Sequence, residues 1–284
     1  MDTKVSSSSR EVVISYDRPT VLIGERINPT GKKKLAAALL AGDMDVVRDE
    51  AQAQVQAGAD VLDVNVGATG VDEVAVLPEA VKAVMEVVEV PICIDSHNPK
   101  ALEAALKVYR GKPIINSVSG QESVLAEVLP LVKQYGAAVI GLTMDDEGIP
   151  QDSERRLAIA RKIIERAEAM GIPREDVIID CLTLTIGSNS KAGLITLDAI
   201  RRVRAEFGVN QTLGASNVSF GLPDREVINN AFIAITIAAG VTCPTVNVAK
   251  VRPTVLSADM ILGRDNHSLR YIRAYRQSLA ASGT

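Results

Sequence analysis

Short apolar runs rich in β-branched residues alternate with longer segments of helical period along most of the chain. The runs predict eight strands, at Val21–Ile27, Asp60–Val66, Ile92–Asp95, Ile114–Val118, Ala138–Met144, Val177–Leu182, Gln211–Ser216 and Thr245–Val248. The segments between them predict helices at Asp45–Ala57, Pro78–Val88, Pro99–Tyr109, Glu122–Tyr135, Ser153–Met170, Thr196–Phe207 and Asp224–Ala239, with two more near Ser257–Leu262 and Ser268–Ala281. Strands that alternate with helices over 284 residues predict an α/β fold with a single closed (β/α)8 TIM barrel. An open, doubly wound sheet is the alternative, but it normally begins with a GxGxxG turn, and the sequence has none.

The N-terminal residues are expected to lie outside this alternation. Residues 1–20 are interpreted as a tail with a possible extra strand: Met1–Arg10 is polar and Ser-rich, which predicts disorder, and Val12–Ser15 predicts a short strand. Residues 21–284 are interpreted as one domain, the barrel with its C-terminal helices.

Composition narrows the classes of partner. The chain is 47% apolar but only 3% aromatic, which suits the aliphatic core of buried parallel strands. The net charge is −4 and no dense Lys/Arg run occurs, so nucleic acid is not expected as a partner; the cluster at residues 32–34 is interpreted as a solvated helix start. No apolar run is long enough to span a membrane and no signal peptide is recognisable, so we expect a cytoplasmic protein. Cys93, Cys181 and Cys243 lack metal or disulfide spacing and are expected to be buried.

Nearly every predicted strand ends in side chains that hydrogen-bond well. They include Glu25 and Asn28 after the first strand, Asp63 and Asn65 in the second, then Asp95, Asn116, Thr143, Asp180, Ser216, Asn217, Asn247 and Lys250. One such residue is usually a helix cap or turn former. A whole ring of them predicts a polar binding site, because the carboxyl ends of barrel strands meet at one face. Asp95, Asn116 and Asp180 suit a flat heterocycle with amino and amide groups, since a carboxylate makes two parallel bonds to such an edge.

Other catalytic sets are missing from the sequence. The two histidines, His97 and His267, have no metal-ligand spacing with the cysteines, so no metal site is expected. No GxSxG elbow and no Walker loop occurs. His97 is expected either to line the pocket or to lie at the surface.

The order and spacing of the strand-end motifs resemble the pterin-binding barrels of corrinoid-dependent methyltetrahydrofolate methyltransferases, from about Ile23 to Lys250. The motifs that carry the resemblance are Gly24–Gly31, Asp63–Gly67, Cys93–Ser96, Ile115–Ser117, Gly141–Met144, Ile179–Asp180 and Gly214–Phe220. The first of them is similar to the opening of the folate module of cobalamin-dependent methionine synthase.

The resemblance implies a role for each matching residue. Asp95, Asn116 and Asp180 would hold the pyrimidine edge of the pterin, and Asn217 would lie beside N5, the nitrogen that carries the methyl group. Three residues in or near the same motif, Gly214, Ser216 and Arg225, would also contribute to binding.

The implied reaction moves a methyl group between N5 of tetrahydrofolate and the cobalt of a corrinoid. N5 is a poor leaving group, so it must gain a proton or a strong hydrogen bond as the C–N bond breaks. We expect the amide oxygen of Asn217 to stabilise protonated N5, while the proton arrives through water or the pocket network. The corrinoid is expected on a separate protein that docks over the barrel mouth, and the resemblance implies a homodimer.

Two alternatives stay open. Dihydropteroate synthases share the barrel and the pterin pocket, but they are expected to carry an Arg-rich loop after the second strand and a late Arg-His pair; residues 67–73 contain no Arg, and the chain's end has no such pair. A non-catalytic folate-binding or corrinoid-docking module is the other. The segment after Asp180 also lacks the proline of one acetogen-type branch, which leaves the methyl source and the direction of transfer open.

Overall fold

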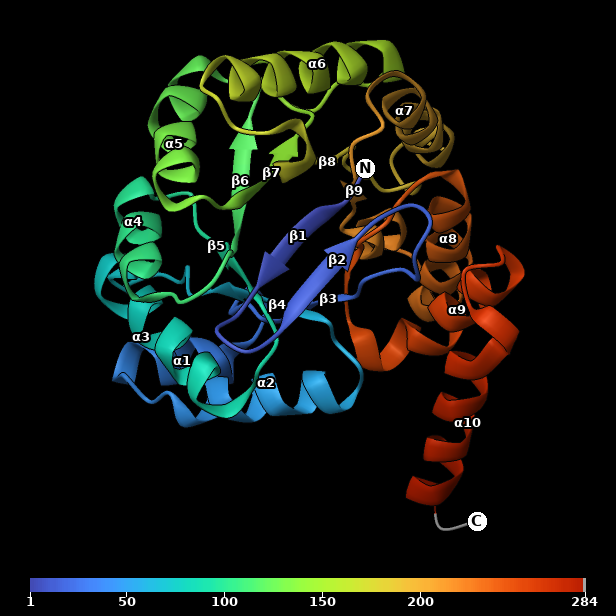
Figure 1. Ribbon diagram of the computed structural model, residues 1–284, viewed down its shortest axis with the longest axis horizontal. Helices are drawn as coiled ribbons and strands as arrows, with labels where there is room; N and C mark the ends of the chain where they lie inside the picture. The colour runs from blue at the N-terminus through green and yellow to red at the C-terminus, as the bar shows by residue number, and fades with distance from the viewer. Residues whose placement is uncertain (283–284) are drawn as a thin grey trace.

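The computed structural model describes residues 1–282 and shows eight parallel strands surrounded by helices (Figure 1). The strands follow the order β10-β3-β4-β5-β6-β7-β8-β9 around the sheet. Their bounds are β3 Ile23–Ile27, β4 Val61–Asn65, β5 Ile92–Asp95, β6 Ile114–Ser119, β7 Ala138–Leu142, β8 Val177–Asp180, β9 Gln211–Thr212 and β10 Thr245–Val246. A parallel bridge between Gly214, just after β9, and Thr245 of β10 joins the two ends of this order, and the Thr245 amide donates to the Leu213 carbonyl at 3.1 Å. The predicted barrel is confirmed.

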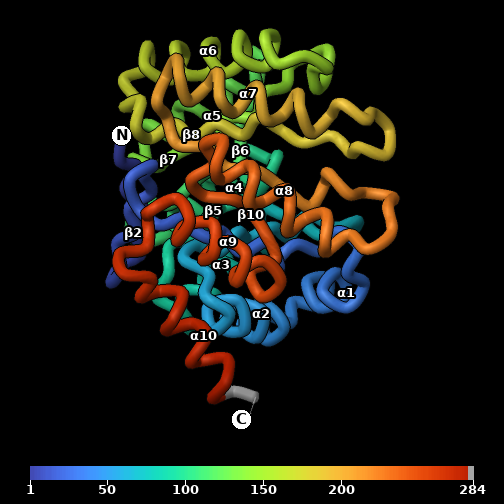
Figure 2. The backbone as a smooth tube through the Cα atoms, turned by 90° about the vertical axis from the view of Figure 1, so that its right-hand side faces the viewer, coloured from blue at the N-terminus to red at the C-terminus, as the bar shows by residue number. Residues whose placement is uncertain are grey.

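The helices form the outer layer, as the two views show (Figures 1 and 2). They are α1 Lys33–Ala41, α2 Asp45–Gln56, α3 Glu73–Val87, α4 Pro99–Val108, α5 Glu122–Tyr135, α6 Ser153–Ala169, α7 Ala192–Phe207, α8 Arg225–Ala239, α9 Val248–Ile261 and α10 Leu269–Ser282. Buried Val, Ile, Leu and Ala side chains fill the space between the strands and this layer. A second buried cluster fills the inside of the barrel, where Cys93 and Cys243 pack with Ile and Val side chains of several strands. All three cysteines are buried and free, as predicted. Within residues 1–282, no helix combines the length and apolar character needed to cross a bilayer.

The predicted disorder of Met1–Arg10 is wrong. Residues Thr3–Ser6 form strand β1, which pairs antiparallel with β2, Glu11–Ile14, where an extra strand was expected. The hairpin lies across the N-terminal end of the barrel, where the parallel strands begin (Figure 1). The Ser6 amide donates to the carbonyl of Lys112, just before β6, at 2.9 Å. Val5 and Ile14 are fully buried in the inner cluster. The Ser-rich composition hides this apolar alternation, and the hairpin closes the barrel end opposite to the polar strand ends.

Two helices that contain a proline, α3 and α9, begin earlier than predicted, whereas α5, which contains Pro130, has its predicted bounds. Helix α3 begins five residues before Pro78, at Glu73, because Asp72 caps it by accepting from the Val74 amide at 3.1 Å. Helix α9 runs through Pro253 and begins at Val248, much earlier than the predicted Ser257. Burial of its apolar side chains against the barrel outweighs the hydrogen bond that proline removes.

Candidate functional site

The strand ends and the loops that follow them enclose one cavity of about 550 Å³. Every site residue predicted from the sequence lines it: Asp95, Asn116, Asp180, Gly214, Ser216, Asn217 and Arg225. Glu25, Asn28 and Asp63 of the predicted polar ring also line it, as do residues without a predicted role, namely Arg26, Thr30, Lys32, Ile140, Thr212, Phe220 and Thr245. His97 is exposed and is not part of the lining, so the surface alternative holds for it.

Strand register brings the first two candidate residues side by side. Asp95 pairs with Asn116 across β5 and β6, and Asn65 of β4 pairs with Asp95 on its other side. The Asn116 amide donates to Asp63 Oδ1 at 3.0 Å. Because in-register parallel neighbours face the same side of a sheet, these side chains form one polar surface at the cavity floor.

Two carboxyl groups, Asp63 and Asp95, share this floor. Burial raises the pKa of Asp63 well above its ordinary value, and the charge of Asp95 raises it further. Burial also raises the pKa of Asp95, whereas a hydrogen bond with the Asn65 side chain lowers it and so offsets part of this shift. The two carboxyl groups also hydrogen-bond to each other, so burial disfavours ionisation of both, and a charge on Asp95 disfavours ionisation of Asp63. Spacing along β4 singles out Asp63 in the sequence, but only the register shows that it sits beneath Asp95.

Asp180 presents a carboxylate that the backbone already holds in place. Its Oδ1 accepts from the Leu182 amide at 2.7 Å, and the Gly214 amide also hydrogen-bonds to the carboxylate. Burial nevertheless raises the pKa of Asp180 to about 6. The remaining lone pairs of the carboxylate are available to an N–H/NH2 edge in the cavity.

A fully buried arginine fixes the loop that carries Asp180. Arg156 of α6 is 0% exposed, and its Nη1 donates to the carbonyls of Cys181 and Leu182 at 2.8 Å each. Its Nε donates to the Pro150 carbonyl at 2.9 Å. Leu182 has a φ of 57°, a left-handed conformation that a branched residue adopts only when its surroundings hold it there. Arg156 therefore holds the turn whose amide positions the Asp180 carboxylate.

Arg156→Met is expected to lower the free energy of unfolding by about 3 kcal/mol, because the carbonyls of Pro150 and Cys181 lose their donor and that of Leu182 keeps only Thr196 Oγ1. Chemical denaturation followed by circular dichroism measures the change. Arg156→Lys restores the charge but not the fork of donors, so it is expected to recover only part of the stability. An unfolding free energy within 0.5 kcal/mol of wild type for Arg156→Met, on the order of ordinary surface substitutions, would contradict this assignment.

Asn217 lies on a turn, and the seventh strand is shorter than the predicted Gln211–Ser216. Strand β9 ends at Thr212, and a short 3-10 helix, η2, spans Ala215–Ser219. Arg225 braces this turn: its Nη2 donates to the Ser216 carbonyl at 2.9 Å and its Nε to Ser219 Oγ at 3.0 Å. The role of Arg225 in the folded protein is thus to hold the turn that carries Asn217.

The side-chain amide of Asn217 is free of protein partners. No hydrogen bond joins it to any residue of the described chain 1–282, whereas Asn116 and Asn229 are both hydrogen-bonded. The residue is exposed, at the cavity lining. A braced turn that presents an unpaired amide to a cavity offers both a donor and an acceptor to a ligand.

Glu25 of β3 and the nearby Lys32 add charged groups to the cavity lining. Burial raises the pKa of Glu25, while Lys32 and Arg26 oppose the shift. Burial also lowers the pKa of Lys32, whose Nζ donates to the Arg26 carbonyl at 2.5 Å. Sequence reasoning gave Lys32 only the role of a helix start; α1 does begin beside it, at Lys33, but the side chain belongs to the cavity.

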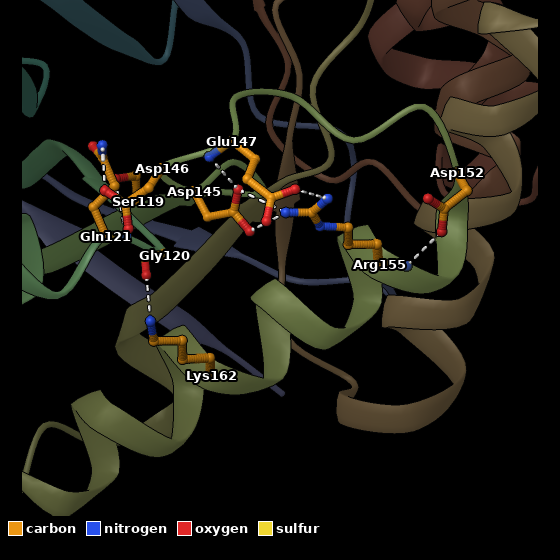
Figure 3. Close-up of polar contacts among 9 residues, drawn as sticks. All are labelled: Ser119, Gly120, Gln121, Asp145, Asp146, Glu147, Asp152, Arg155 and Lys162. Carbon is orange, nitrogen blue, oxygen red and sulfur yellow. Dashed lines mark hydrogen bonds and ion pairs between the residues drawn. The ribbon is translucent and has the colours of Figure 1, made fainter.

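The loops after β6 and β7 are joined by a surface network outside the cavity (Figure 3). Arg155 binds Glu147 at 2.6 Å and Asp145 at 3.0 Å, and Lys162 donates to the Gly120 carbonyl at 2.6 Å. Exposed pairs of this kind contribute at most about 1 kcal/mol each. Their effect is to order two loops on the face of the barrel that holds the cavity.

Comparison with known proteins gives three findings. A family model described as "Pterin binding enzyme" matches residues 24–247. Methionine synthase of Mycobacterium leprae is 33% identical over 265 residues, which cover 89% of this chain but only 22% of that protein, so the chain spans about a fifth of its length. A methylcorrinoid:tetrahydrofolate methyltransferase of Eubacterium limosum is 28% identical, with 90% of this chain and 96% of that protein covered.

Solved structures support the fold. A Yersinia pestis dihydropteroate synthase matches with a TM-score of 0.73 at 18% identity, covering 93% of this chain and 99% of that one. A Xanthomonas albilineans dihydropteroate synthase matches with a TM-score of 0.64 at 20% identity, covering 91% and 98%. At such identities the likeness concerns the barrel alone.

Proposed function

The chain belongs to the pterin-binding enzyme family, and from that premise we propose that it transfers a methyl group between N5 of tetrahydrofolate and the cobalt of a corrinoid. The relative from Eubacterium limosum, matched over nearly its whole length, bears the name of this activity. The corrinoid, on a separate protein docked over the cavity, would supply the group that accepts or donates the methyl. We also propose that the protein is a cytoplasmic homodimer, and light scattering on the purified protein tests the dimer.

The observation that carries the proposal is that one cavity contains both the carboxylates of Asp95 and Asp180 and the unpaired side-chain amide of Asn217. Asp95 and Asp180 accept from the N–H and NH2 groups of the pyrimidine edge, and the amide of Asn116 completes the edge. Asn217 then faces the reduced ring that carries N5. The residues bind and orient the pterin, so the chain needs no nucleophile of its own.

Proton supply at N5 decides the rate of such a transfer. Methyl loss from N5 leaves a nitrogen anion unless a proton is in place, and the carbonyl oxygen of Asn217 stabilises the protonated form. An amide does not donate a net proton near neutral pH. The proton therefore comes from water or from the pocket network, and Asn217 holds it at N5.

Anaerobic mixing with 5-methyltetrahydrofolate and cob(I)alamin tests the proposal. We expect the cob(I)alamin absorbance to be replaced by that of methylcobalamin, and the reverse change from methylcobalamin and tetrahydrofolate. A protein that binds the folate but gives neither change would be a binding module. Product from a dihydropterin pyrophosphate and p-aminobenzoate in a parallel assay would instead favour dihydropteroate synthesis.

A further inference from the structure

A second polar cavity lies at the N-terminal end of the barrel, where the parallel strands begin. It has a volume of about 220 Å³, several times the ~30 Å³ that one water molecule occupies in the liquid. Its walls are the segments before β3 and β4, the end of α2, the turn of the β1–β2 hairpin, and helices α9 and α10. No described residue lines both this cavity and the one at the strand ends, so the proposed methyl transfer gives it no role.

Three arginines from distant segments converge on this cavity. Arg10 comes from the hairpin turn, Arg252 from α9 and Arg270 from α10. Burial raises the pKa of Asp60, and the charges of all three arginines oppose this shift, so the three guanidinium groups lie near one carboxyl group. Gly58 makes room for one of them: its φ is 101°, and a Cβ there would lie 2.4 Å from Arg252 Nε. The fold therefore holds three cations around one space.

The guanidinium groups of these arginines lack protein acceptors. Arg10 Nη2 lies 3.6 Å from Asp60 Oδ1, and Arg270 Nη1 lies 3.6 Å from Asp259 Oδ2, which is too far for a hydrogen bond. The side chain of Arg252 has neither an ion pair nor a hydrogen bond among residues 1–282. A guanidinium carries five N–H donors, so those that face the cavity are available to a ligand.

Both carboxylates of the cavity are already bound by the segment before β3. Asp60 Oδ2 accepts from the Leu22 amide at 3.0 Å. Asp259 accepts from the Thr20 amide at 2.8 Å and from the Thr20 hydroxyl at 2.7 Å. Behind Asp259, at 3.7 Å, lies a fourth guanidinium, that of Arg264, whose side chain is only 9% exposed. Four guanidinium groups thus surround two carboxylates, which leaves two positive charges in excess.

We propose that this cavity binds a phosphate dianion, either inorganic phosphate or the phosphate group of a small organic ester. Arg10, Arg252 and Arg270 donate to its oxygens, because the fork of a guanidinium matches the geometry of a phosphate. The two excess positive charges balance those of the dianion, and the low-dielectric walls concentrate their field in the cavity. Bound phosphate then joins the hairpin and α10 to the barrel, since two of the three arginines come from these segments.

An adjoining groove distinguishes the two sources of phosphate. Arg252 and Leu256 line both the cavity and a groove between α9 and α10, and the groove is also lined by Tyr271 and Tyr275. An ester whose phosphate lies at Arg252 places its aromatic body against these two rings. Inorganic phosphate leaves the groove empty, so the two ligands are expected to differ in affinity if the natural ligand is an ester.

Calorimetry on the full chain tests the site, with inorganic phosphate and phenyl phosphate as probes at about pH 8, where both are mainly dianions. Sodium chloride holds the ionic strength constant. We expect saturable binding to wild type and a Kd raised about 10- to 100-fold in Arg252→Gln, the loss of charge-assisted hydrogen bonds to one guanidinium. Arg252→Lys keeps the charge but not the fork, and is expected to recover only part of the affinity.

Arg201→Gln is the matched control, because Arg201 of α7 is exposed, has no side-chain hydrogen bond among the described residues and does not line the cavity. It is expected to bind both probes as wild type does. Thermal unfolding separates binding from a structural role: without phosphate, Arg252→Gln is expected to keep the wild-type Tm or exceed it, because one of several converging cations is removed. With phosphate, only wild type and the control are expected to gain stability.

A lower Kd for phenyl phosphate than for inorganic phosphate would support an ester as the ligand, and equal values would support inorganic phosphate. Absence of saturable binding of either probe would overturn the proposal. So would a gain in stability that chloride alone reproduces, or an equal loss of affinity in Arg252→Gln and Arg201→Gln. A Tm of Arg252→Gln that falls by the same amount with and without phosphate would make the arginine a structural residue only and would also overturn it.

Discussion

Asn217→Ala is expected to slow methyl transfer by about 10²–10³-fold, the range seen when one group that stabilises transition-state charge is removed. Its amide has no hydrogen bond within the described chain, so the substitution breaks no internal contact and the fold is expected to persist. The interaction strengthens only as N5 becomes protonated, so the Kd for 5-methyltetrahydrofolate is expected to change less than about 3-fold. Single-turnover mixing with cob(I)alamin measures the rate, and calorimetry measures the Kd.

Two further variants identify the atom that matters. Asn217→Asp keeps an oxygen acceptor and is expected to retain more activity than Asn217→Ala, whereas Asn217→Leu keeps the approximate size and is expected to lose as much. Full turnover by Asn217→Ala would remove this residue from the mechanism. Equal losses in rate and affinity would give it a binding role only.

Most of the barrel can be predicted from the sequence, because buried parallel strands need unbroken apolar runs. Each of the eight runs became a strand, and most of the polar residues at their ends line one cavity, although Asn65, Thr143, Asn247 and Lys250 do not. Such convergence follows from topology alone, since all carboxyl ends of a parallel barrel lie at the same face. The roles assigned to these residues come from the family resemblance and stay predictions until variants are measured.

Features that depend on contacts between distant segments escaped prediction. The β1–β2 hairpin is stabilised by contacts with residues a hundred or more positions away, among them the pair of hydrogen bonds between Ser6 and Lys112. In the sequence, Arg156 is indistinguishable from the exposed charged residues of α6. Only the folded structure shows that its guanidinium donates to the carbonyls of Cys181 and Leu182, after Asp180. Phe220 ends the Gly214–Phe220 motif, but nothing in a local pattern indicates that its side chain is exposed at the cavity lining.

Asp180→Asn is expected to weaken pterin binding by about 10- to 100-fold at pH 7.5, because it replaces charge-assisted bonds by neutral ones. In the wild-type protein the pKa of Asp180 is about 6, raised by burial. The ligand's N–H groups need the ionised carboxylate, so below pH 6 the site must first lose a proton. The Kd is then expected to rise up to about tenfold for each pH unit below 6 and to level off above it.

The variant separates this titration from that of the ligand. Because Asn does not ionise, the bend near pH 6 is expected to disappear in Asp180→Asn, while any bend due to N5 itself remains. The same shift has a consequence for stability: a carboxyl whose pKa is raised in the folded state stabilises the fold when protonated, and this contribution is lost as the pH rises through 6. The ligand-free wild-type protein is therefore expected to lose thermal stability between pH 4 and 7 relative to the variant. Parallel pH profiles of Kd in the two proteins would mean that another group, such as Asp95, governs the binding.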